Sequence, residues 1–362
     1  MIPVAKPLID DVEKQKVMEV LESGMLSIGK TVQEFEKAFA DYTGAKYAIA
    51  ASSGTTALHL ALKASGVQPG DKVLTTPFSF VATANSILYT GAIPVFCDVE
   101  DKTFNIDADK IEDFLKNIPG IKALLIVHLY GHPCDMDKIM ELVEKYDLIL
   151  VEDAAQAHGA KYNGRHVGTF GKSGIFSFYP TKNMTTSEGG MVITNDDDVY
   201  TELKLLREHG DTGGYDHKVL GYNYRMTNIS AAIGLGQLEK LDGFNKARSE
   251  NAAYYTEHLK GLDWLELPVS DEKCVHCYHQ YTIKVKKDRD RFVEYLKENG
   301  IGSRVYYPVT IPSQTLYKEL GYDELSFPVA DQLCKEVVSI PVHPAVTAED
   351  REKIVKVIKN YE

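Results

Sequence analysis

Between residues 10 and 242 the sequence alternates between helical and strand patterns, and this alternation limits the fold more than any other feature. Helical periodicity occurs at 10–23, 31–43 and 55–65. Apolar runs typical of strands occur at 47–51, 71–77, 93–99, 121–130, 147–153, 174–179 and 189–195. Strands that alternate with helices favour an α/β fold, with a mostly parallel sheet covered by helices on both faces.

The pattern changes after a long helical stretch at 229–260. Strand-like runs follow at 279–285, 302–308 and 337–341, with a helical run at 289–300 and a final helix. These elements indicate a compact α+β unit. We therefore expect a large domain over residues 1–245 and a small C-terminal domain over 246–362, with the first few residues of the chain packed against the small domain.

The charge of the chain narrows its possible partners. The 362 residues carry a formal net charge of -12, which argues against nucleic acid as a main partner, because phosphate backbones need clustered Lys and Arg. The five cysteines have no framework spacing, which is typical of a reducing compartment. Neither a signal-peptide pattern nor an apolar run of bilayer length is visible. We expect a cytoplasmic protein with no nucleic-acid and no membrane partner.

The first motif that could carry chemistry is SSGTT, Ser52 to Thr56, between an expected strand and an expected helix. Backbone N–H groups at a helix N-terminus, approached through a glycine, form an anion site. Ser and Thr are also the preferred N-caps of helices. On its own the motif therefore favours the simpler interpretation, a capping turn.

The second motif is LILVEDAAQAHGA, in which an apolar run ends in Glu152 and Asp153. A carboxylate at the tip of a buried strand is costly unless it has a cationic or hydrogen-bonding partner. Ligands of α/β proteins bind at such strand ends. A helix cap or a solvated strand end would explain the residues equally well, so both interpretations stay open.

The third motif is FSFYPTKNMTTSEGGM, in which Pro180 ends a strand pattern and Lys182 follows. A lysine that is desolvated beside strand ends can become an uncharged nucleophile well below its free pKa of about 10.4. The commonest fate of a lysine is an exposed surface position. Together, however, an anion cup, a buried carboxylate and a lysine at strand ends are the parts that pyridoxal phosphate requires for its phosphate, its ring nitrogen and its aldehyde.

The sequence resembles the DegT/DnrJ/EryC1/StrS family of sugar aminotransferases over nearly its whole length. The segments that carry the resemblance occur in the family's order and at compatible spacing, and they are LSIGKTVQEFEKAFADYTGAKYAIAASSGTTALHLAL, TTPFSFVATANSILYTGAIPVFCDV, VEDAAQAHGA, FSFYPTKNMTTSEGGM, LREHG and GYNYRMTNISAAIGLGQLEKLD. The resemblance implies the fold of type I pyridoxal phosphate enzymes and a homodimer with shared active sites. It also implies transfer of an amino group, with glutamate as the expected donor, to C4 or C3 of a nucleotide-linked keto sugar.

The resemblance also implies roles for individual residues. Lys182 would hold the cofactor aldehyde covalently and move the proton during transfer, and Asp153 would pair with the ring nitrogen. The remaining cofactor contacts would be Gly54, Thr55, Thr56 and Ser177 at the phosphate, Phe80 stacked on the ring, Gln156 near the ring hydroxyl, and Asn223 at the phosphate of the neighbouring subunit's cofactor. No metal site is expected.

Two other functions remain open at this point. A protein of this family could bind the cofactor as a sensor without turnover, because some relatives regulate transcription, although no DNA-binding segment is visible. The segment GMLSIGKT, Gly24 to Thr31, formally satisfies a P-loop pattern, but it follows a helical pattern where a P-loop requires a strand.

Several polar residues are treated as structural. CVHCYH, residues 274–279, lacks the second ligand pair of a closed zinc site, and His279 is expected near the sugar site. His128 and His132 are expected to be structural, with His158 as an outlying candidate. Many relatives carry a histidine near the position of Ser313, and its absence leaves the identity of the sugar open.

Overall fold

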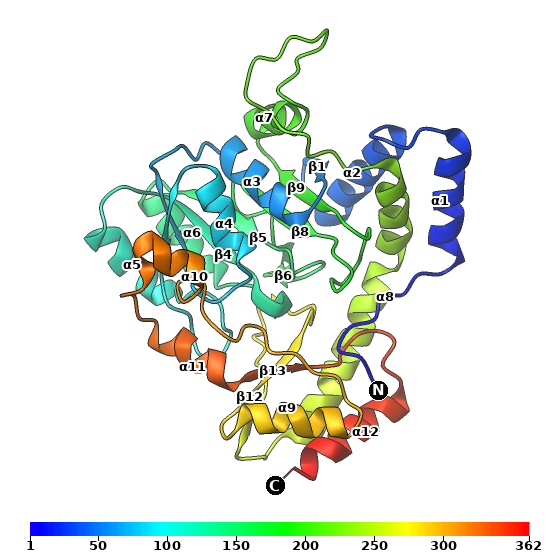
Figure 1. Cartoon of the computed structure of the whole chain (residues 1–362), viewed down its shortest axis with the longest axis vertical. Coiled ribbons are helices and arrows are strands. Elements are labelled where there is room, and N and C mark those ends of the chain that lie inside the picture. Colours follow the sequence, from blue (N-terminus) through cyan, green and yellow to red (C-terminus); the bar gives the residue numbers. More distant parts are fainter. Residues whose placement is uncertain (362) are drawn as a thin grey trace.

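The computed structural model describes residues 1–361 and places a seven-stranded sheet at the centre of the molecule (Figure 1). The strands lie in the order β1 (Tyr47–Ala51), β9 (Gly190–Thr194), β8 (Ser173–Ser177), β5 (Ile149–Asp153), β4 (Ile121–Val127), β2 (Lys72–Thr75) and β3 (Ile93–Phe96). Only β9 runs antiparallel to its neighbours; the other pairs are parallel. The predicted α/β fold with a mostly parallel sheet is confirmed.

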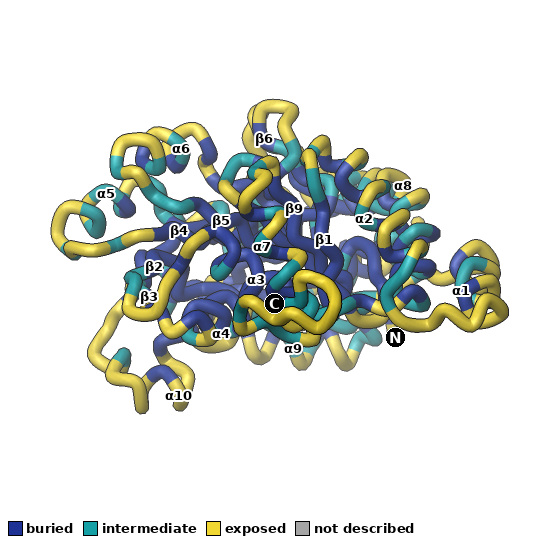
Figure 2. The backbone as a smooth tube through the Cα atoms, turned by 90° about the horizontal axis from the view of Figure 1, so that it is seen from above, coloured by how far each residue is buried: buried dark blue, intermediate teal, exposed yellow. Residues whose placement is uncertain are grey.

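Helices cover both faces of this sheet. One face packs on α3 (Gly54–Ala64), α4 (Ala82–Tyr89) and α7 (Asp197–Arg207). The other face packs on α2 (Lys30–Thr43), α5 (Ala108–Asn117), α6 (Met136–Lys145) and the first half of α8 (Asn228–Leu259). The strands are almost wholly buried between these layers (Figure 2). This double burial explains why their sequences read as continuous apolar runs.

The N-terminal helix α1 (Asp11–Ser23) lies outside this layer and packs on α8. Asp10 and Glu13 form a capping box at its start, and Gly24 ends it in the left-handed conformation, at φ 69°. Among residues 1–361 no helix combines the length and the apolar character needed to span a membrane.

The C-terminal part has its own small antiparallel sheet of β10 (Leu265–Glu266), β12 (Tyr281–Val285) and β13 (Val337–Ile340), packed on α9 (Arg289–Glu298) and α12 (Ala348–Lys359). Ile2 joins this core and pairs with Ile301, as expected for the first residues of the chain. The strand expected at 302–308 is wrong: only Arg304 pairs with Ser339, so no continuous ladder forms.

The segment after residue 305 returns to the large sheet. In this segment Tyr317 and Phe327 pack against Phe96 of β3. Its short helices are α10 (Thr315–Tyr317), the π-helical turn η2 (Lys318–Tyr322) and α11 (Pro328–Glu336). A third small sheet pairs β11 (Cys274–Val275), β6 (Lys161–Tyr162) and β7 (Arg165–His166). The domain boundary near residue 245 stays a prediction.

Candidate active site

Three segments at the ends of strands meet at one edge of the sheet. Ala51 of β1 and Ser177 of β8 both lie opposite Gly190 of the intervening strand β9, and Asp153 of β5 lies opposite Ile175 of β8. The chain leaves β1, β5 and β8 at this same edge, so SSGTT, EDAAQ and the lysine segment come together there. The shared edge of parallel strands is where the sequence placed the candidate site.

Two glycines allow the close approach at this edge. A Cβ on Gly54 would lie 2.7 Å from Ser177 Cβ and 2.9 Å from its Oγ. A Cβ on Gly190 would lie 2.3 Å from the carbonyl oxygen of Ser53. Only glycine fits at either position, so the first turn of α3 is pressed directly onto the ends of β8 and β9.

The first turn of α3 serves both as a cap and as an anion cup. Ser53 Oγ accepts a hydrogen bond from Thr56 N (3.1 Å), and Thr56 Oγ1 accepts one from Ser53 N (3.0 Å). Within residues 1–361, the N–H groups of Gly54 and Thr55 donate to no protein acceptor. The capping interpretation therefore applies to Ser53 and Thr56, and the two free N–H groups of Gly54 and Thr55 are the donors available to an anion.

Asp153 is a buried carboxylate at the end of β5, with an exposed fraction of 4%. Its Oδ2 accepts a hydrogen bond from Thr83 Oγ1 (2.9 Å), and its Oδ1 accepts one from Ala155 N (3.1 Å). Burial raises the pKa of Asp153 above its ordinary value, although these two donors and the charge of Lys182 oppose the shift. Thr83, at the start of α4, was missed in the sequence because nothing there distinguishes it from an ordinary helix residue.

Glu152, the neighbour of Asp153, points to the opposite face of the sheet and has a structural role. Its two carboxylate oxygens accept hydrogen bonds from the N–H groups of Gly168 and Gly171, each at 2.7 Å. His128 Nδ1 accepts from Cys134 N (3.1 Å), so its Nε2 carries the proton that is donated to Glu152 (3.0 Å). His128 is thus the satisfied structural histidine that was expected.

Lys182 lies five residues beyond the end of β8, in a segment that we call the lysine loop (residues 178–189). Its side chain is partly buried. Burial lowers the pKa of Lys182 to about 8, and the negative charge of Asp153 opposes that shift. About a tenth of the amine is therefore uncharged at pH 7 and about half at pH 8, as a nucleophilic lysine requires.

Gln156 and Phe80 both lie near Tyr307, a residue that the sequence did not indicate. Gln156 Oε1 accepts a hydrogen bond from Tyr130 N (2.9 Å), and its Nε2 donates to Tyr307 Oη (3.2 Å). The Phe80 and Tyr307 rings lie 6.4 Å apart at 35°, and 58% of Phe80 is exposed. Tyr307 arrives from a segment some 150 positions later, so no local pattern could place it here.

Asn223 is exposed, and its side chain makes no hydrogen bond within residues 1–361. Its backbone pairs with Glu208 at the base of a loop that projects from the body beyond α7 (Figure 1). The next residue, Tyr224, accepts a hydrogen bond from Ser52 N through its carbonyl oxygen (2.8 Å). The loop is thus tied to the anion cup of its own chain, while Asn223 is exposed.

The remaining candidates have structural settings. Gly24–Thr31 joins helices α1 and α2, so the strand that a P-loop needs is missing before it. His158 and His279 are buried beside Lys182, and burial and that positive charge lower the pKa of each. Ser313 is exposed and pairs with Thr310 (2.8 Å).

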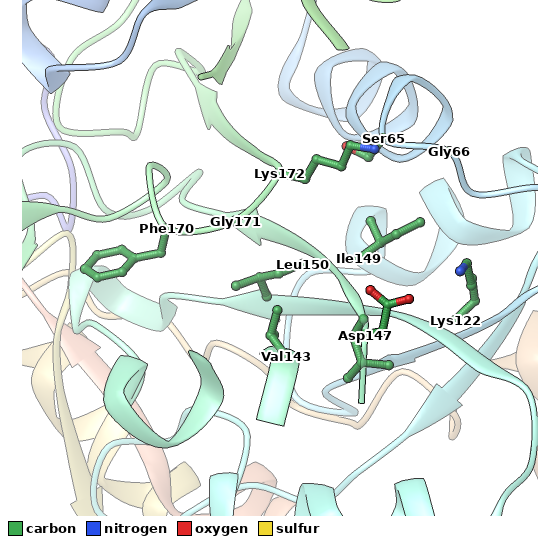
Figure 3. Close-up of a pocket in the computed structure, with 11 residues that line it drawn as sticks. Ser65, Gly66, Lys122, Val143, Asp147, Ile149, Leu150, Phe170, Gly171 and Lys172 are labelled. Atoms are coloured by element: carbon green, nitrogen blue, oxygen red, sulfur yellow. The ribbon is translucent and has the colours of Figure 1, made fainter. Parts of the chain in front are cut away.

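A hollow of 420 Å³ opens at the opposite edge of the sheet (Figure 3). Lys122, Asp147 and Lys172 are among its lining residues, and all three are exposed. It lies at the amino-terminal ends of β5 and β8, whereas the residues described above follow the carboxyl-terminal ends.

A profile of the DegT/DnrJ/EryC1/StrS aminotransferase family matches residues 7–359. The chain belongs to this family. A pleiotropic regulatory protein from Geobacillus stearothermophilus is 41% identical over 96% of this chain and 95% of its own. A GDP-perosamine synthase from Caulobacter vibrioides is 40% identical over 98% and 96%. The PLP form of a Streptococcus pneumoniae protein superposes with a TM-score of 0.93 at 29% identity, covering 99% of this chain and 97% of that one.

This family member is a pyridoxal phosphate-dependent aminotransferase, and the site fits its cofactor. Two unpaired N–H groups of α3 suit a phosphate. The buried carboxylate of Asp153 suits a protonated ring nitrogen, because its present hydrogen-bond donors are neutral groups. The amine of Lys182, with its lowered pKa, suits an aldehyde.

Proposed function

We propose that this aminotransferase moves an amino group, with glutamate as donor, to the keto carbon at C4 or C3 of a nucleotide-linked sugar. The observation that carries the proposal is the meeting of Lys182, Asp153 and the open first turn of α3 at one sheet edge. The likeness to a GDP-perosamine synthase supports the nucleotide-linked substrate. When bound, the cofactor supplies an aldehyde that exchanges with amino groups and a ring that withdraws electrons from the carbon bearing them.

In this proposal the carboxylate of Asp153 keeps the ring nitrogen protonated. A cation placed beside Asp153 also returns its pKa toward the ordinary range, because the cost of burying the carboxylate is offset. Thr83 and the N–H of Ala155 hold the two carboxylate oxygens in position. Gly54 and Thr55 bind the phosphate through their N–H groups, with the Ser177 hydroxyl adjacent.

Lys182 has two tasks. Its amine would hold the cofactor aldehyde covalently, and the free amine would move the proton between two carbons. An amine with a pKa of about 8 can do both near neutral pH, since neither its charged nor its neutral form is rare. Phe80, whose largely exposed ring lies near Tyr307, and Gln156, which is hydrogen-bonded to Tyr307, would orient the ring.

The covalent anchor is tested by borohydride reduction of the holoenzyme followed by peptide mapping. The reduced cofactor should be found on Lys182. Labelling of another lysine would reject the assignment.

The substrate is tested with the amine form of the cofactor on the enzyme. A panel of nucleotide-linked 3-keto and 4-keto sugars is added, and the visible absorbance of the aldehyde form is followed. Return of this absorbance with one sugar identifies the substrate and the carbon. Return with simple keto acids but with no keto sugar of either class would contradict the proposal.

We further propose a homodimer in which Asn223 reaches the cofactor phosphate of the partner subunit. The exposure of Asn223, whose side chain has no hydrogen-bond partner within residues 1–361, and the projecting loop support this. Lys182→Ala chains and Asn223→Ala chains, each inactive alone, are co-expressed with different tags, and mixed dimers are isolated. A residue acting in trans leaves one site of the mixed dimer complete, so activity should return. A folded but inactive mixed dimer would place Asn223 in its own subunit's site.

A second function, cofactor binding by a sensor without turnover, is tested separately, because a regulatory protein is among the similar chains. A sensor would bind the cofactor and show its absorbance but would not complete both half-reactions. Release of 2-oxoglutarate from glutamate, in amounts well above one per site when the keto sugar is present, separates an enzyme from a sensor.

A further inference from the structure

Two amide side chains of helix α8 accept hydrogen bonds from the lysine loop. Gln237 Oε1 accepts a hydrogen bond from Thr185 N (3.4 Å), and Asn245 Oδ1 accepts one from Asn183 Nδ2 (2.8 Å). Figure 1 shows α8 running along one side of the molecule from the large sheet to the C-terminal part. The residue that follows Lys182 is therefore fixed to a long helix rather than only to its own loop.

Asn183 is buried, with an exposed fraction of 3%. Its Nδ2 donates a second hydrogen bond, to the carbonyl oxygen of Cys277 (3.0 Å). Its own Oδ1 is buried and finds no partner within residues 1–361. An unpaired buried oxygen costs about 1–3 kcal/mol, so the orientation of this amide is dictated by the two acceptors on its NH₂ side.

Asn245 continues the chain of hydrogen bonds. Its Nδ2 donates to the carbonyl oxygen of His158 (2.8 Å), which fixes its Oδ1 toward Asn183. His158 lies in the same loop as Asp153, five residues later in the chain. Two asparagines thus connect the backbone beyond Asp153 to the residue beside Lys182, and each amide has only one orientation that satisfies its neighbours.

We propose that Asn183 and Asn245 are positioning residues that hold the Lys182 amine in its desolvated place facing Asp153. The inference rests on the proposed role of Lys182, but it concerns the reactivity of the amine itself. A chain that never transferred an amino group would still show it.

The charged and titratable groups that face Lys182 come from three segments. Asp153 of β5 raises the pKa of Lys182, whereas His158 and His279 are neutral because burial lowers their pKa. Arg248 of α8 lies near the two histidines and donates to the carbonyl oxygens of Tyr278 and His279, each at 3.2 Å. Burial is the largest cause of the lowered pKa of Lys182, so a loosened loop that admits water should raise it.

The test is competitive labelling of lysines with acetic anhydride at a series of pH values, on the full chain freed of cofactor. Acetylation of the Lys182 peptide is measured by mass spectrometry, and the exposed Lys172 at the opposite sheet edge (Figure 3) is the internal reference. Asn183→Leu and Asn245→Leu change no charge. Each should raise the apparent pKa of Lys182 by about one unit or more, which lowers its labelling at pH 8 about fivefold.

Asn251→Leu is the matched control. Asn251 is also on α8 and 3% exposed, and its Nδ2 donates to the carbonyl oxygens of Val342 (3.1 Å) and His343 (3.3 Å), away from the lysine loop. It should leave the titration of Lys182 unchanged. An equal shift in the control, or no shift in Asn245→Leu, would overturn the proposal.

A double variant tests whether the two residues act as one unit. Asn183→Leu with Asn245→Leu should shift the pKa no further than the larger single change, because the two residues share one hydrogen bond. Fully additive pKa shifts would show that the two asparagines do not act as one unit. Should Asn183→Leu fail to fold, Asn245→Leu alone decides, since Asn245 is only partly buried.

Discussion

Gly54→Ala is the sharpest perturbation that the site offers. The added methyl carbon would lie 2.7 Å from Ser177 Cβ and 2.9 Å from Ser177 Oγ. Because carbon atoms prefer separations of about 3.5–4.0 Å, the start of α3 must withdraw by about 1 Å. The free N–H groups of Gly54 and Thr55 move with it.

The effect on cofactor binding follows from this displacement. A hydrogen bond to a charged group contributes about 1.5–3 kcal/mol and fails when the donor moves by about 1 Å. Loss of one phosphate contact should therefore weaken cofactor binding about 10- to 150-fold, since each 1.4 kcal/mol is a factor of ten. The dissociation constant is measured by titrating the cofactor-free protein with pyridoxal phosphate and following its absorbance.

Two further variants separate the clash from a general effect of adding a methyl group. Gly243→Ala, also on a helix, meets no atom within 4 Å and should leave binding unchanged while stabilising the fold by up to about 1 kcal/mol. Ser177→Gly removes the two nearest atoms, Cβ and Oγ, and leaves Ser177 Cα at 3.4 Å from the new methyl group. Because it also removes the hydroxyl placed at the phosphate, the double variant is compared with Ser177→Gly alone, and adding Gly54→Ala should cost less affinity in that background. Normal binding by Gly54→Ala would refute the reasoning, and an equal loss in both backgrounds would show that Ser177 is not the obstacle.

Three other changes test the remaining parts of the site. Asp153→Asn keeps the shape but loses the charge, so turnover should fall by orders of magnitude; near-normal turnover would remove Asp153 from this role. Lys182→Met should stabilise the cofactor-free chain at pH 7 by up to about 3 kcal/mol in urea unfolding. The sign follows because the pKa of about 8 in the folded chain lies below that of the unfolded chain, about 10.4. The unsubstituted protein should therefore gain stability as the pH rises from about 8 to about 10.4. Absence of that rise in native protein would contradict the assigned burial. Glu152→Gln places an NH₂ group against at least one N–H donor, that of Gly171, and should cost about 1–3 kcal/mol of unfolding free energy; an unchanged urea midpoint would show that the carboxylate is not needed there.

Local sequence patterns predicted the strand-helix order well, because burial on both faces makes the sheet strands stand out as apolar runs. The antiparallel direction of β9 was not predictable, since parallel and antiparallel buried strands have the same composition. The run at 302–308 has the tyrosine and valine content of a strand, but in the structure only Arg304 finds a pairing partner. The pairing with β13 stops there because the chain leaves the small sheet after Arg304, and Val305, Tyr306 and Tyr307 pack against the large sheet.

The residues of the site also divide into those that local sequence patterns predicted and those that they did not. Gly54, Asp153, Ser177 and Lys182 could be brought together from the sequence because each follows a strand of one sheet. Thr83 and Tyr307 could not, since each contributes a side chain whose importance depends on what faces it. The use of Thr56 in the cap, rather than as an open donor, depends on the rotamer of one hydroxyl, which no pattern of residues encodes.

The continuity of α8 has a consequence for how substrate enters. This helix has 32 residues, a length of about 48 Å, and runs unbroken from the large sheet past the proposed boundary at residue 245. A hinge at that boundary would have to bend the rod that carries Asn245 and Arg248, and no proline interrupts it. Opening is therefore expected from a small rotation of an exposed side chain such as Phe80, rather than from a swing of the C-terminal part. The radius of gyration in solution should then stay constant as substrate binds.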